Sequence, residues 1–301
     1  MAQVKDWFSA FRLRTLPLAF SCIIVGSASA FKNDHPDFWL IFALALLTTL
    51  FLQVLSNLAN DLGDTLNGAD SDDRKGPKRA VQTGVISIRQ MKTAVIISSL
   101  LSLVSGISLL LVSFGINLLL EVGIFFALGL ASIAAAIKYT MGKNPYGYSG
   151  LGDLFVFIFF GLVGVLGSNF LYSKSLDSTN WYLAISVGLL SVGVLNINNI
   201  RDIKSDFKAG KISIPVRLGA HYAALYHLAL IAIAMALPII YCMESNLLQP
   251  QNLLYVLAYP FLGWNCFKIA TLTPCQMNPY LKQLALSTFL FSILFSVAIN
   301  L

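Results

Sequence analysis

The amino-acid sequence predicts an all-α integral membrane protein, in which nine transmembrane helices surround a central cavity that opens to the cytoplasmic side. Three observations lead to this prediction: the composition, a series of nine apolar runs, and the positions of the basic residues. Of the 301 residues, 57% are hydrophobic and only 11% are charged. Soluble domains carry about 25% charged residues, so a soluble domain of this size is excluded.

Each apolar run is long enough to cross a bilayer, because the hydrocarbon core needs about 20 apolar residues of helix. The first run follows the polar stretch MAQVKDWFSAFRLRT and has no small-residue cleavage site, so we expect a retained helix rather than a signal peptide. No soluble appendage is evident, and we expect residues 1–301 to form one transmembrane domain. The runs lie roughly at 16–32, 38–58, 93–114, 117–138, 151–172, 181–199, 221–242, 251–271 and 281–300.

The basic residues predict the orientation, because cytoplasmic loops are enriched in Lys and Arg. With the N-terminus in the cytoplasm and nine spans, only Lys32 and Lys174 of the 20 basic residues fall on the outer side. A wrong number of spans would place many basic residues on the outer side. The asymmetry therefore supports both the number of spans and the cytoplasmic position of the N-terminus. Topology alone explains many of these bases, and no nucleic-acid motif accompanies them. The inner residues are Lys5, Arg12, Arg14, Arg74, Lys75, Lys78, Arg79, Arg89, Lys92, Lys138, Lys143, Arg201, Lys204, Lys208, Lys211, Arg217, Lys268 and Lys282.

The polar connections are concentrated on the cytoplasmic side. Two long ones, residues 60–92 and 200–220, follow the second and sixth runs, and the inner segment 138–152 is rich in Gly, Pro and Tyr, as turns are. One-sided polarity favours a membrane-embedded enzyme with a cytoplasmic mouth. A cation-coupled transporter is the alternative from another class, but it should carry ionisable groups near the membrane centre, where the sequence places none securely.

The second run ends in an acidic cluster, NLANDLGDTLNGAD. Spacings of three and four place Asn57, Asn60, Asp61 and Asp64 on one face if the helix continues. Carboxylates that converge repel each other unless a cation lies between them. Oxygen ligands without His or Cys favour Mg²⁺, and the four cysteines and three histidines are too scattered for a zinc site. Helix capping or a solvated loop is the simpler alternative.

A second cluster, NINNIRDIKSDFKAGK, ends the sixth run. It repeats the order of the first: Asn198 precedes Asp202 by four residues, Asp206 follows, and basic residues come next, as Asp70 and its basic neighbours do in the first cluster. Asp202 and Asp206 are four residues apart and offer a second metal site. Asn198 either orients a ligand or bonds to a neighbouring helix, since an unpaired amide in a membrane is costly.

Basic residues beside both clusters suit a diphosphate, whose charge needs metal and guanidinium partners. Arg79 and Lys211 are favoured because they lie within the loops, past the acids. Lys138 ends the fourth run, where it reaches the same mouth or extends to the membrane surface. Asp153, at the start of the fifth run, caps a helix or belongs to the active site.

A phosphate site that opens on an apolar interior suits an amphiphile with a diphosphate head and a long hydrocarbon tail, such as a polyprenyl diphosphate. Ionisation of its allylic C–O bond leaves a delocalised carbocation. Metal ions stabilise the departing diphosphate, and a water-poor cavity protects the cation until an electron-rich aromatic acceptor attacks it.

At these residues the sequence resembles the UbiA superfamily of intramembrane prenyltransferases, which have nine transmembrane helices and two aspartate-rich motifs. The first motif, roughly NDxxDxxxD, matches Asn60, Asp61 and Asp64, but its last Asp is displaced, with Gly68 in its place and Asp70 two residues later. The second, DxxxD, matches Asp202 and Asp206. Within the superfamily the loops, including GPKRAVQTG and YTMGKNPYGYSGLGDLFVFIFFG, are most similar to the branch that prenylates 1,4-dihydroxy-2-naphthoate in menaquinone biosynthesis.

The resemblance implies a reaction that joins a polyprenyl diphosphate to 1,4-dihydroxy-2-naphthoate, releases diphosphate and CO₂, and gives demethylmenaquinol. It implies Mg²⁺ as cofactor, a place in the bacterial cytoplasmic (inner) membrane, and no obligate protein partner. Asp64, Asp202 and Tyr139 are the expected catalytic residues, with Tyr139 near the allylic carbon. The expected metal ligands are Asn60, Asp61, Asp64, Asp70, Asp202 and Asp206, and the expected diphosphate contacts are Arg79, Lys138, Lys211 and Asn198. A prenyltransferase for 4-hydroxybenzoate or another acceptor is the alternative within the enzyme class.

Overall fold

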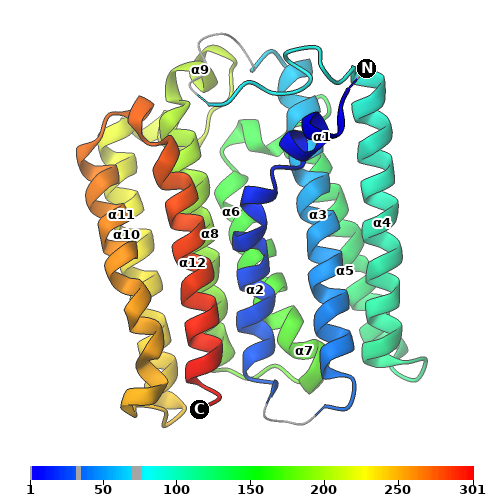
Figure 1. Ribbon diagram of the computed structural model, residues 1–301, viewed down its shortest axis with the longest axis vertical. Coiled ribbons are helices and arrows are strands. Elements are labelled where there is room, and N and C mark those ends of the chain that lie inside the picture. Colours follow the sequence, from blue (N-terminus) through cyan, green and yellow to red (C-terminus); the bar gives the residue numbers. More distant parts are fainter. Residues whose placement is uncertain (1, 32–34, 70–75) are drawn as a thin grey trace.

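The computed structural model describes residues 2–31, 35–69 and 76–301, and over these residues it is all-helical, with no strand. Its long helices run side by side between two ends of the molecule (Figure 1). Nine of the described segments are long and apolar enough to cross a membrane, as predicted. They are Val4–Ala28, Phe38–Leu66, Ile88–Phe114, Leu119–Lys138, Gly152–Ser173, Asn180–Arg201, Ile214–Glu244, Pro250–Thr271 and Asn278–Ala298.

Several spans are composite. The first span contains a 3₁₀ turn at Leu13–Thr15, the seventh has a kink at Gly219, and the eighth begins with the 3₁₀ segment Pro250–Ala258. The α-helices are α1 (Val4–Phe11), α2 (Leu16–Ala28), α3 (Phe38–Leu66), α4 (Ile88–Phe114), α5 (Leu119–Lys138), α6 (Gly152–Val156), α7 (Ser168–Ser173), α8 (Asn180–Arg201), α9 (Ile203–Lys208), α10 (Ile214–Glu244), α11 (Tyr259–Thr271) and α12 (Asn278–Ala298).

Helix α8 is the most buried span and packs closely against the fifth span. Glycine permits this approach: a Cβ on Gly161 would lie 2.6 Å from the Ala184 carbonyl oxygen, and one on Gly188 would lie 2.9 Å from the Phe157 ring. Small residues at such contacts allow close backbone packing in membranes. The fifth span has a π-helical centre, Phe157–Gly167, which the apolar run did not predict because its length and composition suit either kind of helix.

The first span differs from the predicted run 16–32, because the chain bends before it. Arg12 adopts a left-handed conformation with φ 49° and separates the short helix α1 from α2. The Asn57 side chain secures the bend by donating to the Phe11 carbonyl oxygen and to Thr15 Oγ1. Asn57 therefore holds the α1–α2 junction, although it shares a helical face with the acids of α3.

Both acidic clusters lie at one end of the bundle. The end of α3, the short helix α9 and the N-terminus are together at the top of Figure 1, and the C-terminus is at the opposite end. This arrangement agrees with an odd number of spans. That this end is cytoplasmic stays a prediction from the basic residues.

Candidate active site

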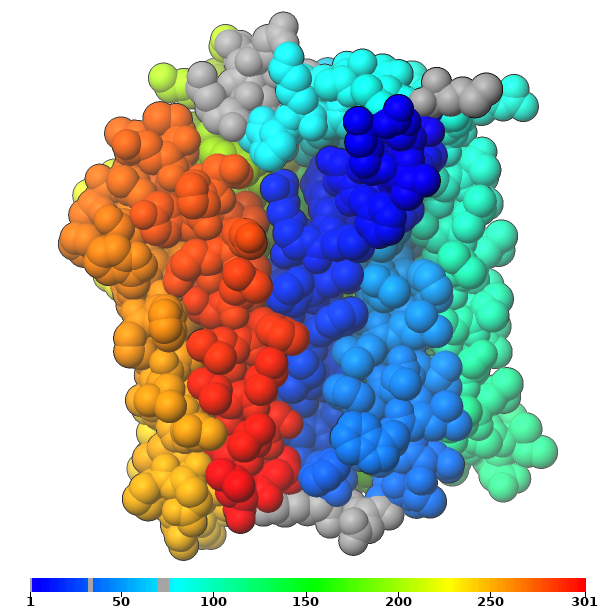
Figure 2. Space-filling view, in the orientation of Figure 1, coloured from blue at the N-terminus to red at the C-terminus, as the bar shows by residue number. Residues whose placement is uncertain are grey.

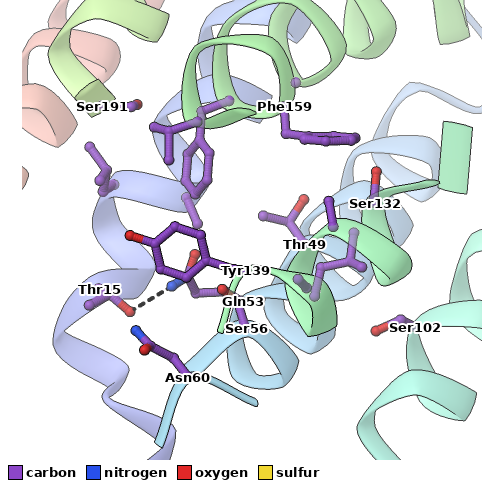
Figure 3. Close-up of a pocket in the computed structure, with 18 of the residues that line it drawn as sticks. Thr15, Thr49, Gln53, Ser56, Asn60, Ser102, Ser132, Tyr139, Phe159 and Ser191 are labelled. Atoms are coloured by element: carbon purple, nitrogen blue, oxygen red, sulfur yellow. Dashed lines mark hydrogen bonds between the residues drawn. The ribbon is translucent and has the colours of Figure 1, made fainter. Parts of the chain in front are cut away.

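An elongated cavity of about 740 Å³ extends from the acidic end into the bundle. Asn60, Asp61 and Arg79 line it near the acidic end, whereas Leu110 and Leu171 line its deep part. Figure 3 shows the wall between, where hydroxyl and amide groups alternate with apolar side chains. The labelled residues there are Thr15, Thr49, Gln53, Ser56, Asn60, Ser102, Ser132, Tyr139, Phe159 and Ser191.

The first cluster is organised around Asp64, which is almost fully buried near the end of α3. Its Oδ2 atom lies 2.7 Å from Arg79 Nη2, and its Oδ1 atom accepts a hydrogen bond of 2.9 Å from the Tyr148 hydroxyl. Arg79 also donates to the backbone and side-chain oxygens of Asn60, at 2.6 and 3.3 Å. The guanidinium thus joins the two residues that the first motif places four positions apart.

The loop after α5 is fixed on α3 by close backbone packing. A Cβ on Gly63 would lie 2.4 Å from Thr140 Oγ1, so only glycine allows this contact. Thr140 donates to the Ala59 carbonyl oxygen, and Asn67 donates to the Thr140 carbonyl oxygen at 2.7 Å. This docking places Tyr139 on the cavity wall and brings the loop that carries Tyr148 to the acids.

The second cluster forms at the bend between α8 and α9. Asp202 is the junction residue, and both of its carboxylate oxygens accept from Arg201, at 2.9 Å from Nε and 2.6 Å from Nη2. Arg201 also donates to Asn198 Oδ1 at 2.7 Å and to Asn278 Oδ1 at 2.8 Å. One buried guanidinium therefore ties the second motif to the start of α12.

Asp206 pairs with Lys211 at 3.4 Å, and both side chains are buried. Burial raises the pKa of Asp206 to about 6, although the Lys211 charge opposes this effect. Burial alone would lower the pKa of Lys211, but the negative charges of Asp64 and Asp206 outweigh it and raise that pKa. Lys211 therefore lies within the electrostatic reach of both clusters, which the fold has brought to one place.

The carboxylates lie behind their basic partners. Arg79, Arg201 and Lys211 line the cavity, together with Asn198, whereas Asp64, Asp202 and Asp206 are covered by them. A ligand that enters the cavity meets the cationic groups and Asp61 first. The arrangement suits an anionic head group.

The donor set fits a hard divalent cation. Asp61, Asp64, Asp202 and Asp206 are all buried, and buried acids of this number need positive charge. Asp206 Oδ2 makes no hydrogen bond within the described residues, only the ion pair with Lys211, so it retains capacity for a ligand bond. In the described part of the chain, however, no three acidic, His or Cys side chains are already gathered as a metal site.

One of the predicted site residues within the described chain, Lys138, is not brought into this group. Lys138 is exposed and lies outside the cavity lining, which agrees with a lysine that extends to the membrane surface. Asp70 falls outside the described residues. Asp153, left open above, is buried in α6 and accepts a hydrogen bond of 3.1 Å from Tyr226, away from the cavity lining.

Two residues at the site were not predicted from the sequence, and a third, Arg201, was noted among the basic residues beside the second cluster but not favoured. Tyr148 reaches Asp64 from 84 positions away and Asn278 reaches Arg201 from 77 positions away, and no local pattern signals such contacts. The contact of Arg201 with Asp202 has a local signal, because the two residues are adjacent in the sequence. Adjacent side chains on a regular helix, however, point in different directions. The end of α8 at Arg201 removes this restriction.

The sequence is similar to known proteins along almost its whole length. The profile of the UbiA prenyltransferase family matches residues 19–293. The 1,4-dihydroxy-2-naphthoate octaprenyltransferase of Haemophilus influenzae is 42% identical over 299 residues, which cover 99% of this chain and 96% of that protein. The 1,4-dihydroxy-2-naphthoate octaprenyltransferase of Escherichia coli is 41% identical over 305 residues, which cover 100% and 97%.

Solved structures support the fold. A UbiA homolog from Aeropyrum pernix K1 superposes with a TM-score of 0.68 at 21% identity, covering 100% of this chain and 98% of that one. A UbiA homolog from Archaeoglobus fulgidus bound to GPP and Mg²⁺ gives a TM-score of 0.61 at 18% identity, covering 97% and 100%.

Proposed function

The chain belongs to the UbiA prenyltransferase family, and we propose that it transfers a polyprenyl group from a polyprenyl diphosphate to 1,4-dihydroxy-2-naphthoate. The products are diphosphate, CO₂ and demethylmenaquinol, an intermediate of menaquinone biosynthesis. The observation that carries the proposal is the identity of about 40% with two 1,4-dihydroxy-2-naphthoate octaprenyltransferases over almost the whole chain. The cavity, cationic at one end and mostly apolar beyond it, supports the same function.

The cationic end is the proposed diphosphate site. Arg79, Arg201 and Lys211 face the cavity with side chains that are almost fully buried, and charge-assisted bonds to phosphate are strongest where water is excluded. Each of these bases also neutralises an aspartate. When the diphosphate binds, each base can turn its remaining N–H groups to a phosphate oxygen and thereby order the head group.

The acidic residues are the proposed Mg²⁺ ligands. Asn60, Asp61 and Asp64 would act from the first motif, with Asp70 assisting, and Asp202 and Asp206 from the second. When bound, Mg²⁺ neutralises the diphosphate and makes it a better leaving group. The structure of the Archaeoglobus fulgidus homolog bound to GPP and Mg²⁺ supports this assignment for the family fold.

A row of aromatic rings leads from the diphosphate site along the cavity wall. Tyr139 and Tyr146 meet edge to face at 5.4 Å, Tyr146 stacks on Phe155 at 4.0 Å, and Phe155 is followed by Phe159 at 6.2 Å. All four rings line the cavity. Aromatic faces attract cations, so the row suits an allylic carbocation and the isoprene units behind it.

Within this row, Tyr139 is the ring on which the charges of Lys211, Asp64 and Asp206 act. Burial raises the pKa of Tyr139 to about 12, so the phenol stays protonated at neutral pH. It therefore offers no phenolate oxygen that the carbocation could alkylate. We infer that Tyr139 shields the allylic carbon from water while its ring stabilises the positive charge. The acceptor then loses its carboxylate as CO₂ when the new C–C bond forms.

The site is assigned to the cytoplasmic side of a bacterial inner membrane, because eighteen of the 20 basic residues fall on that side of the nine-span topology. The test of the proposed function is turnover by the purified full-length protein with a labelled polyprenyl diphosphate, 1,4-dihydroxy-2-naphthoate and Mg²⁺. We expect prenylated product with Mg²⁺ and none with EDTA. Absence of product under both conditions would overturn the proposal.

A further inference from the structure

A second hollow, separate from the active-site cavity, lies between α1, α3 and α4. Its volume is about 720 Å³. Trp7 and Phe11 of α1 form one side of it, and the two hollows share Leu13 as their one common lining residue within the described chain. In Figure 2, α1 stands out from the face of the bundle over α3 and beside α4. Nothing in the prenyl transfer reaction requires this groove.

The groove is amphiphilic along its length. Arg89, Gln90 and Thr93 line it at the start of α4, near the end of the bundle that carries the acidic clusters. Its remaining lining is mostly apolar and continues along α4 to Ile97 and Leu101. None of its described lining residues is acidic, so the polar end presents a net positive charge.

The dimensions correspond to one leaflet of a bilayer. Arg89 and Leu101 are twelve residues apart on α4, which is about 18 Å of helix. Half of the hydrocarbon core is about 15 Å thick. An occupant whose head group meets Arg89 would therefore place its chain along Ile97 and Leu101 and end near the membrane centre, as the acyl chains of a phospholipid do.

We propose that this groove binds an anionic phospholipid, with its phosphate or second acidic group on Arg89 and an acyl chain against Trp7, Phe11 and the apolar face of α4. Charge complementarity favours an anionic phospholipid over a zwitterionic one, because the head group of a zwitterionic lipid would place a positive charge beside Arg89. The bound lipid braces α1 from one side. The other side of α1, including Phe8 and Ala10, lines the active-site cavity, so the lipid also stabilises the wall of that cavity.

The test uses fluorescence quenching of Trp7, with Trp39, Trp181 and Trp264 replaced by Phe. The full-length protein is placed in phosphatidylcholine nanodiscs that contain a fixed minor fraction of a dibrominated lipid. The dibrominated lipid is phosphatidylglycerol in one series and phosphatidylcholine in the other. We expect about fivefold tighter association of the glycerol lipid at low salt, since one interfacial Arg favours an anionic lipid by about this factor. The preference should weaken at high salt.

Arg89→Gln should remove the preference, whereas Lys92→Gln, which removes one charge from the same helix outside the groove, should retain it. Arg89→Lys should keep most of it. Equal quenching by the two lipids in the wild type, or equal loss in both Gln variants, would overturn the proposal. Displacement of the brominated phosphatidylglycerol by a short polyprenyl diphosphate would also overturn it, because the groove would then be a substrate site.

Discussion

Arg79 Nη2 lies 2.7 Å from Asp64 Oδ2, and the same guanidinium holds the backbone oxygen of Asn60. A residue of the polar loop thus occupies the centre of the first aspartate motif, with Tyr148 bonded to the other oxygen of Asp64. The second motif repeats the arrangement with Arg201 on Asp202. In both motifs a buried aspartate is therefore paired with a buried arginine.

Asp64→Asn and Asp202→Asn should each reduce prenyl transfer by about a thousandfold or more, since metal assistance contributes several kcal/mol to the transition state. Each change keeps the side-chain size but removes the charge of a proposed metal ligand, in a different motif each time. The measurement is turnover with saturating Mg²⁺ after membrane insertion has been checked. Asp37→Asn, at an exposed acid of the opposite end, is the control and should be neutral. Near-normal turnover in either site variant would refute the two-motif arrangement.

Arg201→Gln should destabilise the fold as well as weaken the binding of polyprenyl diphosphate. Removing one partner of a buried ion pair costs about 3–5 kcal/mol, and Arg201 also holds Asn198 and Asn278. Thermal unfolding in detergent and KM for the prenyl diphosphate are the two readouts. Arg201→Lys should recover part of the stability but little of the binding, because an ammonium cannot reproduce the forked contact with Asp202. Unchanged unfolding and KM in the Gln variant would contradict the role.

Gly63→Ala should lower activity through packing alone. The added Cβ would lie 2.4 Å from Thr140 Oγ1 and 2.7 Å from the Thr140 carbonyl carbon, so the loop that carries Tyr139 must move. Such overpacking costs about 1–3 kcal/mol. Gly123→Ala, in α5 and outside the cavity lining, is the matched control, because a Cβ there meets nothing within 4 Å. Equal unfolding temperatures for the two variants would show that the loop is not fixed on α3 at this point.

These contacts show which features the sequence predicts and which it does not. The nine spans are predictable, because the length and polarity of each segment depend on the membrane and are local properties. Asp64 and Asp202 are candidates for the same reason: acids beside a membrane are costly unless they have a use. Tyr148 is different, since its contact with Asp64 depends on how the loop after α5 docks on α3, and Gly63 and Thr140 determine that docking through close packing.

The π-helical centre of the fifth span and the bend at Arg12 show the same limit. The bend is held by tertiary contacts, namely the bonds from Asn57 to Phe11 and Thr15, which no local pattern signals. Lys138 ends a span, and that position suits either a diphosphate contact or a lysine that extends to the membrane surface. The structure leaves its side chain exposed, which agrees with the second role. The sequence therefore predicts which residues carry charge at the site, but the packing decides which of them face the cavity.

The orientation can be tested with the native cysteines. Cys275 is exposed, in the connection between α11 and α12, and the distribution of basic residues places this connection in the cytoplasm. A membrane-impermeant thiol reagent should label it in inverted vesicles but not in intact cells. Cys242, at the opposite end of α10, is buried, so Ser175→Cys in an exposed outer connection supplies the opposite control. Labelling of Cys275 from outside intact cells would show that the orientation is the opposite of the predicted one.

The acceptor separates the proposed function from the alternative within the family. Both acceptors are electron-rich phenols with a carboxylate, and the preference for 1,4-dihydroxy-2-naphthoate over 4-hydroxybenzoate is supported by the relatives that are 42% and 41% identical. The two reactions differ in the position of the new bond. With the naphthoate, the prenyl group replaces the carboxylate and CO₂ leaves, whereas with 4-hydroxybenzoate the bond forms beside the hydroxyl and the carboxylate stays. Carboxyl-labelled naphthoate should therefore release one labelled CO₂ for each prenylated product. Prenylation of 4-hydroxybenzoate with retention of its label, together with no reaction of the naphthoate, would assign the enzyme to the other acceptor and leave the diphosphate site unchanged.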